Sequence, residues 1–277
     1  MSGMPEPNRR TVLRMGLGLG LGTALGAAAG TAALPRAVAE PAPTYQSGSF
    51  VSAARGGIRT SWAIARPPGQ NAPLRPVIAL HGKGSDAATV MAGGVEQGLA
   101  DAVAAGLPPV AVVAVDGGGG YWHKRASGDD AGTMVLDELL PMLAGQGLDT
   151  SRVGFLGWSM GGYGALLLGS RLGPARTAAI CAVSPALWTS PGAAAPGAFD
   201  DAADYADNSV WGMPELGAIP IRIDCGTGDP FAAATRGFIA QLPSPPAGGF
   251  SPGGHDSGFW SSQLPAEISW LAPKLVA

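Results

Sequence analysis

The sequence predicts an α/β fold in which helices flank a mostly parallel central sheet. Short, continuous apolar runs recur along the chain, and each is followed by glycine, proline or a polar residue. Such runs are typical of strands that are buried on both faces of a parallel sheet. Segments of helical length, rich in alanine, leucine and valine, separate most of these runs. Strand and helix therefore alternate as they do in an α/β domain.

The elements are expected in the following order. Residues 47–66 alternate loosely and predict two antiparallel strands, and Ser85 or Asp86 can cap the first helix. The buried strands are predicted at 76–82, 109–120, 152–157, 177–185 and 219–229, and the helices at 87–105, 133–145, 160–172, 231–241 and 260–271. Residues 188–217 break this rhythm, and we expect them to form an irregular excursion over one edge of the site rather than a second domain.

The first 39 residues are predicted to be an export signal. Arg9 and Arg10 are followed by a Gly/Ala/Leu stretch, and small residues at Ala37 and Ala39 suit cleavage after Ala39. The pattern resembles a twin-arginine signal, whose passengers fold before they cross the membrane. An ordinary secretory signal and an uncleaved anchor are the alternatives. Residues 40–277 are then a single domain that is exported, secreted or associated with the cell envelope.

Charge and hydropathy exclude some partners for this domain. Without residues 1–39 the chain has 13 basic and 19 acidic residues, a net charge of −6, and no block of five or more basic residues remains. We therefore expect no nucleic-acid partner. No later run of 18 apolar residues occurs, so no stable membrane insertion is expected after cleavage. Cys181 and Cys225 lie in apolar runs and predict buried free thiols, with a bridge between neighbouring strands as the alternative.

The segment Gly157-Trp158-Ser159-Met160-Gly161 is the G-x-S-x-G pattern, placed between a predicted strand and a predicted helix. A tight turn there would strain Ser159, and glycine at 157 and 161 would remove the Cβ atoms that collide with neighbours. The helix that follows directs the positive end of its dipole at the same spot. The pattern predicts that Ser159 is a nucleophile.

A serine nucleophile needs a base, and in this arrangement the order along the chain is serine, acid, histidine. Only His255 follows Ser159, since His81 and His123 precede it. Asp229 lies just beyond the end of a predicted strand, where the acid is expected. Asp224, within that strand, is the alternative acid, although a structural role as an acceptor suits it better.

The remaining site residues follow from the strand ends. The backbone N–H groups of Met160 and Lys83 are the expected oxyanion donors, and His81 is expected to pack or hydrogen-bond beneath the loop. Tyr121, Trp122 and Trp158 are candidates for a substrate wall, although Tyr121 and Trp122 suit simple packing equally well. The three histidines are scattered and lack the spacing of metal ligands, so no metal is expected.

Four blocks, "LHGKGSD", "GWSMGGYGAL", "DCGTGDPF" and "GGHDSGFW", resemble those of the esterase D type of esterases, within the α/β-hydrolase superfamily. The resemblance covers roughly residues 73–272. The segment "YWHKRASGDDAGTMVLDELLP" resembles secreted actinobacterial-type members. The resemblance implies hydrolysis of small-molecule or lipid-like carboxylic esters through Ser159, Asp229 and His255, without a cofactor.

Two other functions use the same scaffold. Related secreted mycolyltransferases have glutamate as the acid and Asp-Gly where this chain has His81-Gly82, so both differences favour a hydrolase. An acyltransferase nevertheless forms the same acyl-enzyme and stays an alternative. A secreted binding protein without activity is disfavoured by the presence of all three residue types.

Replacing Arg9 and Arg10 together by lysine is expected to block export, because the arginine pair is the signal that the twin-arginine route reads. Immunoblots of the cytoplasm, envelope and culture fluid measure this. Normal secretion of the variant would favour the general secretory route instead.

Overall fold

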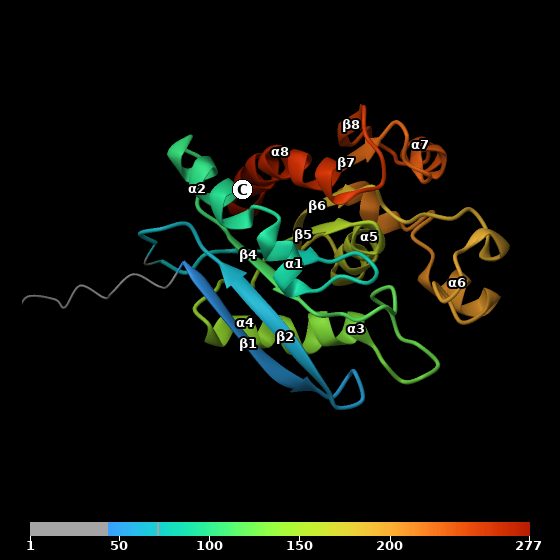
Figure 1. Cartoon of the computed structure of the whole chain (residues 1–277), viewed down its shortest axis with the longest axis horizontal. Coiled ribbons are helices and arrows are strands. Elements are labelled where there is room, and N and C mark those ends of the chain that lie inside the picture. Colours follow the sequence, from blue (N-terminus) through green and yellow to red (C-terminus); the bar gives the residue numbers. More distant parts are fainter. Residues whose placement is uncertain (1–43, 71) are drawn as a thin grey trace, which may run out of the picture. The chain divides into compact units, whose positions relative to one another are not determined.

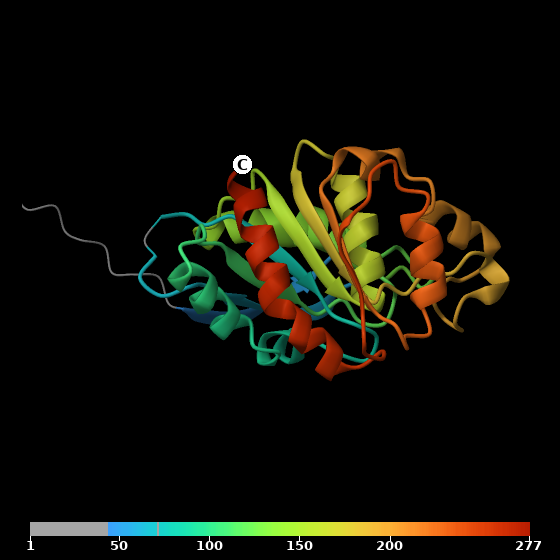
Figure 2. The same ribbon diagram turned by 90° about the horizontal axis from the view of Figure 1, so that it is seen from above.

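The computed structural model describes residues 44–70 and 72–277, and the predicted signal at 1–39 lies outside them. Within the described part, the chain forms an eight-stranded sheet with helices on both faces (Figures 1 and 2). The strand order is β1-β2-β4-β3-β5-β6-β7-β8. The strands are β1 (Tyr45–Ser52), β2 (Ile58–Ala65), β3 (Pro76–Leu80), β4 (Ala111–Val115), β5 (Val153–Trp158), β6 (Thr177–Val183), β7 (Ile221–Gly226) and β8 (Ala247–Ser251).

The sheet is mostly parallel, as predicted. β1 pairs antiparallel with β2, and β2 pairs antiparallel with β4. The remaining pairs, from β4 and β3 through to β7 and β8, are all parallel. Every residue of β3, β4, β5 and β6 is buried, which explains why these strands are continuous apolar runs.

Helices cover the two faces of the sheet as separate apolar layers. The residues of α1, α2 and α8 pack in one buried cluster. Those of α3, η1, α4, α5 and α7 pack in the cluster on the other face. The helices are α1 (Ala87–Ala92), α2 (Val95–Ala104), α3 (Ala131–Thr133), the π-helical η1 (Met134–Leu139), α4 (Leu140–Gly145), α5 (Met160–Leu172), α6 (Ala202–Asn208), α7 (Ala232–Ile239) and α8 (Ser257–Val276). None of the helices in this part of the chain has the length and hydropathy needed to span a bilayer.

The structure differs from the expected elements in three places. The helix expected at 87–105 is two helices, because the chain turns at Gly93 and Gly94, where Gly94 has a φ of 99°. Strand β8 was not expected, since its sequence AGGFS has two glycines and no apolar alternation. Helix α8 begins three residues earlier than expected, at Ser257, where Asp256 caps it by accepting a hydrogen bond from the Phe259 N–H at 2.9 Å.

The irregular segment 188–217 contains the short helix α6 and the 3₁₀ turns η2 (Pro191–Ala193) and η3 (Pro214–Ala218), but no strand. Cys181 in β6 and Cys225 in β7 are both buried and free. The expectation of buried free thiols is therefore confirmed.

Glu267 of α8 is fully buried, and neither of its carboxyl oxygens has a hydrogen-bond partner within the described residues. Burial raises the pKa of Glu267 well above its usual range, and the charge of Asp224 adds to this, whereas Arg222 acts in the opposite direction. The folded chain therefore keeps Glu267 protonated at a pH where the unfolded chain ionises it.

We expect Glu267→Gln to raise the free energy of unfolding at pH 8 and to change it little near pH 4. Above the ordinary glutamate pKa, the wild-type chain loses roughly 1.4 kcal/mol of stability per pH unit, until the raised pKa of the folded state is reached. The glutamine side chain does not ionise, so the stability of the variant does not fall with pH for this reason. Urea unfolding at both pH values is the measurement.

The matched control for this experiment is Glu96→Gln, at an exposed position of α2. It should show the same small effect at both pH values. An equal effect of Glu267→Gln at pH 4 and pH 8 would contradict the assignment of a buried, protonated carboxyl.

Candidate active site

Ser159 lies at the sharp turn between β5 and α5. Its backbone has a φ of 54° and a ψ of −114°, a left-handed conformation that is strained for a residue other than glycine. Two contacts with β6 and the loop after it stabilise this conformation. The Ser159 N–H donates to the Val183 carbonyl, and the Ser159 carbonyl accepts from the Ala186 N–H, both at 3.0 Å.

Two glycines permit this turn. A Cβ on Gly157 would overlap the backbone of Gly161, and a Cβ on Gly161 would overlap the Leu80 carbonyl at the end of β3. Farther along α5, a Cβ on Gly164 would overlap the Trp122 indole. The turn therefore packs backbone against backbone, as expected from the sequence pattern.

The structure brings Ser159, His255 and Asp229 together in one hydrogen-bonded series. The His255 Nε2 atom lies 2.8 Å from Ser159 Oγ, and His255 Nδ1 lies 2.8 Å from Asp229 Oδ2. A carboxylate oxygen can only accept, so Nδ1 carries the proton and Nε2 accepts from the serine hydroxyl. This arrangement can take the proton from Ser159 Oγ as the oxygen attacks an electrophile.

Asp229 is held as a carboxylate. Its second oxygen accepts a hydrogen bond from the Phe231 N–H at 2.8 Å. Burial acts to raise the pKa of Asp229, but the hydrogen bonds that the carboxylate accepts, that from His255 above all, together outweigh it, and the pKa lies below its usual range. At neutral pH the negative charge can therefore stabilise an imidazolium at His255.

Two aromatic rings that the sequence reasoning did not assign hold the imidazole. The rings of Phe231 and Trp260 each lie 5.2 Å from the His255 ring, measured between centroids. Phe231 ends the motif "GDPF" and Trp260 ends the motif "SGFW". Each therefore follows closely after the acid or the base in the sequence, and this closeness could have indicated a place at the site.

A cavity of about 240 Å³ opens at Ser159 and His255, between α1 and α8. Its apolar lining includes Val90 of α1 and Trp260 and Leu264 of α8, together with Trp158 beside the serine. Trp158 thus lines the cavity as the sequence suggested. Val90 and Leu264 gave no sequence signal beyond helical periodicity.

Lys83 and Met160 also adjoin Ser159. Met160 is the first residue of α5, so its N–H has no intrahelical partner. Lys83 lines the cavity, and no described residue accepts a hydrogen bond from its backbone N–H. The Lys83 side chain is exposed, and its ammonium donates to the Pro196 carbonyl at 3.3 Å.

Tyr121 and Trp122 lie away from this cavity. Trp122 is fully buried, with its ring 5.0 Å from that of His81, so the idea that it forms a substrate wall is not supported. Tyr121 is 4% exposed and packs against Tyr163, with the Lys83 ammonium 5.6 Å from its ring centroid. Both residues have a positive φ, 57° and 60°, which the sequence did not signal.

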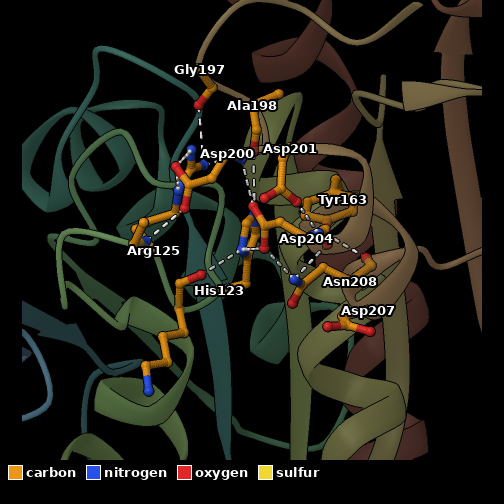
Figure 3. A network of polar contacts seen from close by, with 12 residues as sticks. His123, Arg125, Tyr163, Gly197, Ala198, Asp200, Asp201, Asp204, Asp207 and Asn208 are labelled. Carbon is orange, nitrogen blue, oxygen red and sulfur yellow. Dashed lines mark hydrogen bonds and ion pairs between the residues drawn. The ribbon is translucent and has the colours of Figure 1, made fainter. Parts of the chain in front are cut away.

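A polar network fastens the segment 188–217 to the rest of the domain (Figure 3). Arg125 donates to Asp200 at 2.7 Å, and the Tyr163 hydroxyl donates to the Asn208 carbonyl at 2.6 Å. These contacts join the segment to the loop after β4 and to α5, the helix that begins at the nucleophile turn.

His123 is part of the same network rather than of the site. Its Nε2 atom lies 3.2 Å from the Ala198 carbonyl, and its Nδ1 atom lies 3.4 Å from the Asp204 carboxylate (Figure 3). Burial lowers the pKa of His123, and Asp204 opposes this. The side chain is structural in this arrangement.

Cys181, Asp224 and Glu267 form a cluster of side chains of the types that can bind a metal ion, and their potential ligand atoms lie within 4.8 Å of one another. Both oxygens of Asp224 accept hydrogen bonds from Arg222, at 2.6 and 3.0 Å, and the guanidinium charge opposes a cation there. Asp224, the alternative acid, is thus paired with Arg222, whereas His255 Nδ1 is bonded to Asp229.

The fold and the relay at the nucleophile turn define an α/β hydrolase. A family model described as "Putative esterase" matches residues 57–271, so the chain belongs to this esterase family. Among curated protein sequences, none matches the chain.

Solved structures share the fold. A ferulic acid esterase aligns with a TM-score of 0.73 and 20% identity, over 83% of this chain and 98% of that chain. MPT51 (FbpC1) of Mycobacterium tuberculosis gives 0.66 at 19% identity, over 84% and 100% of the two chains. An S-formylglutathione hydrolase from Agrobacterium tumefaciens gives 0.65 at 19%, over 83% and 95%. At these identities the likeness shows the fold.

Gly161→Ala is expected to destabilise the domain by about 1–3 kcal/mol and to slow the labelling of Ser159 by a fluorophosphonate on the order of 10²-fold. The new methyl group would force apart the nucleophile turn and the end of β3, and small misplacements of a reacting atom are costly. Urea unfolding and labelling rates measure the two effects.

Gly119→Ala serves as the control, since a Cβ at that loop position meets nothing within 4 Å. Wild-type labelling in the Gly161 variant would show that the turn tolerates a Cβ there.

Proposed function

We propose that the protein is a serine carboxylic ester hydrolase that acts through an acyl-enzyme. The observation that carries the proposal is the His255 imidazole, which lies 2.8 Å from both Ser159 Oγ and Asp229 Oδ2. A histidine between a hydroxyl and a carboxylate is the geometry that turns a serine into a nucleophile.

The proposed reaction begins when Ser159 Oγ attacks the ester carbonyl carbon and His255 Nε2 takes the hydroxyl proton. The N–H groups of Met160 and Lys83 stabilise the oxyanion, and the dipole of α5 adds to this. His255 then gives the proton to the departing alkoxide, which leaves as the alcohol. Water then attacks the acyl carbon while His255 Nε2 takes a proton from it; the bond from that carbon to Ser159 Oγ breaks, Oγ takes the proton back from His255, and the acid is released.

Asp229 does not change its protonation state in this sequence. It orients the imidazole through Nδ1–H and stabilises the positive charge that the ring gains twice per turnover. Its lowered pKa keeps the carboxylate ionised for this role.

The cavity supports esters in which one side of the scissile bond is compact. A cavity of about 150 Å³ lined by apolar side chains accommodates a benzene molecule. The cavity of about 240 Å³ at Ser159 therefore suits a single ring or a short chain and is too small to enclose a long acyl chain. Its apolar lining by Val90, Trp158 and Leu264 favours an uncharged group.

The comparisons support this class of substrate without naming the substrate of this chain. One structural neighbour is described as a ferulic acid esterase and another as an S-formylglutathione hydrolase. Both names denote hydrolases of small acyl compounds. We propose as well that the domain acts after export. The observation that supports this is the arginine pair, Arg9 and Arg10, in the predicted signal that precedes the domain.

Ser159→Ala is expected to lower kcat on short p-nitrophenyl esters by roughly 10⁴–10⁶-fold, the scale of losing such a nucleophile. Asp229→Asn is expected to lower it roughly 10⁴-fold, because the amide favours the wrong imidazole tautomer. Steady-state assays of purified protein lacking residues 1–39, with acyl chains from acetyl to palmitoyl, are the measurement.

If the acyl group occupies the cavity, activity should fall as the acyl chain lengthens; activity that does not depend on acyl length would place the alcohol group in the cavity. Wild-type rates in Ser159→Ala would end the proposal. Acceptor alcohols added to the assay distinguish hydrolysis from acyl transfer. If a new ester forms in place of the free acid, the acyl-enzyme reacts with the alcohol and the protein is an acyltransferase.

A further inference from the structure

His81 follows β3, and each nitrogen of its ring is hydrogen-bonded to a backbone group: one to a carbonyl and the other to an N–H. Its Nδ1 atom lies 2.7 Å from the Gly82 carbonyl oxygen, and its Nε2 atom lies 2.9 Å from the Gly117 nitrogen. A carbonyl can only accept and a backbone N–H can only donate, so the ring has its proton on Nδ1 and a lone pair on Nε2.

The surroundings of His81 maintain this neutral tautomer. The side chain is 1% exposed, with the Trp122 ring against it. Burial lowers the pKa of His81, although the Gly82 hydrogen bond and the charges of Asp116 and Asp86 act in the opposite direction. The imidazole thus joins the loop after β3 to the loop after β4 with both nitrogens satisfied.

The carbonyl that His81 holds belongs to the residue beside the nucleophile. A Cβ added to Gly82 would meet the Ser159 Cβ at 3.6 Å, so the Gly82 backbone lies next to the nucleophile with only the space of one methyl group between them. The Gly82 carbonyl also accepts the Ser85 N–H at 3.2 Å, across a tight turn in which Gly84 has a φ of 78°. Two donors therefore fix the direction of this carbonyl.

Fixing that carbonyl also fixes the next N–H. In a planar trans peptide, the C=O of one residue and the N–H of the next point in opposite directions. The Gly82 carbonyl points at the His81 ring, so the Lys83 N–H points away from it. Lys83 lines the cavity at Ser159, and no described residue accepts its N–H.

We propose that His81 is a positioning residue for the oxyanion site: by donating from Nδ1 to the Gly82 carbonyl, it holds the Gly82–Lys83 peptide in the orientation that directs the Lys83 N–H at the oxyanion on the Ser159 adduct. This inference rests on the proposed ester hydrolysis. It adds a residue that does not touch the substrate and acts through one peptide plane.

Two substitutions separate the contacts of His81. In His81→Asn, the side-chain amide nitrogen is as many bonds from Cα as Nδ1 of histidine, so it can still donate to the Gly82 carbonyl. The asparagine side chain is too short to reach Gly117. In His81→Gln, the amide oxygen is as many bonds from Cα as Nε2 of histidine, so it can accept from the Gly117 N–H. The donor at the position of Nδ1 is lost. Each variant loses one hydrogen bond, so their losses of unfolding free energy should be similar.

Their kinetics should differ. We expect kcat of His81→Gln on p-nitrophenyl butyrate to fall about 10–100-fold, below the loss of roughly 10²–10³-fold for removing a whole oxyanion donor. The loss in His81→Asn should be at least fivefold smaller. KM should change less than twofold in both, because the oxyanion contact forms in the transition state. Equal losses of kcat in the two variants, or losses confined to KM, would overturn the proposal.

A double-mutant cycle tests the route through Lys83. Proline at position 83 removes the N–H at the second position of a tight turn, where proline is favoured. Lys83→Ala, which keeps the N–H, corrects for loss of the side chain. If His81 acts through this N–H, His81→Gln should lower kcat much less in the Lys83→Pro background than in the Lys83→Ala background. Equal effects in the two backgrounds would overturn the proposal.

Different results would remove the esterase activity and the role of His81. A wild-type protein that neither hydrolyses esters nor labels at Ser159 with a fluorophosphonate would remove the proposed function, and the role of His81 with it. An active wild type with equal kcat losses in His81→Asn and His81→Gln would remove only the role of His81. Thermal unfolding of each variant verifies that the compared proteins are folded.

Discussion

The strained backbone of Ser159 depends on close contact between the β5–α5 turn and the end of β3. Gly161 has no Cβ, so the turn can lie directly against the Leu80 carbonyl. On the other side, the Ser159 N–H donates to the Val183 carbonyl and the Ser159 carbonyl accepts from the Ala186 N–H. Three neighbouring strands thus supply the energy that keeps one residue in a conformation it would not adopt alone.

The same arrangement explains why the chemistry gathers at one edge of the sheet. In a parallel sheet the loops after successive strands share an edge, so residues far apart in the sequence become neighbours. Ser159 follows β5, Asp229 follows β7 and His255 follows β8. Each loop contributes one group, and the hydrogen bonds of 2.8 Å at His255 join them.

Much of this arrangement was predictable, because the residues involved have special roles. The G-x-S-x-G pattern after an apolar run located Ser159, and chain order then left only His255 as the base. Strand β8 was missed because its glycines carry no periodic signal, although it positions the loop that holds His255. For Trp122 the sequence left a substrate wall and simple packing equally open, because an aromatic residue after a strand end has the same pattern in both cases. Only the path of the chain in space, with positive φ angles at Tyr121 and Trp122, distinguishes these cases.

The two thiols of this chain have a consequence for where it can fold. Cys181 and Cys225 lie in adjacent strands yet remain free and buried, so no covalent cross-link helps to hold β6 to β7. Burial raises the pKa of both thiols, that of Cys225 to about 11, so neither ionises to the reactive thiolate at neutral pH. The fold therefore needs no oxidant to form and offers little to an oxidant once formed. The pairing of β6 with β7 can therefore be completed under reducing conditions, because no disulfide has to form between them.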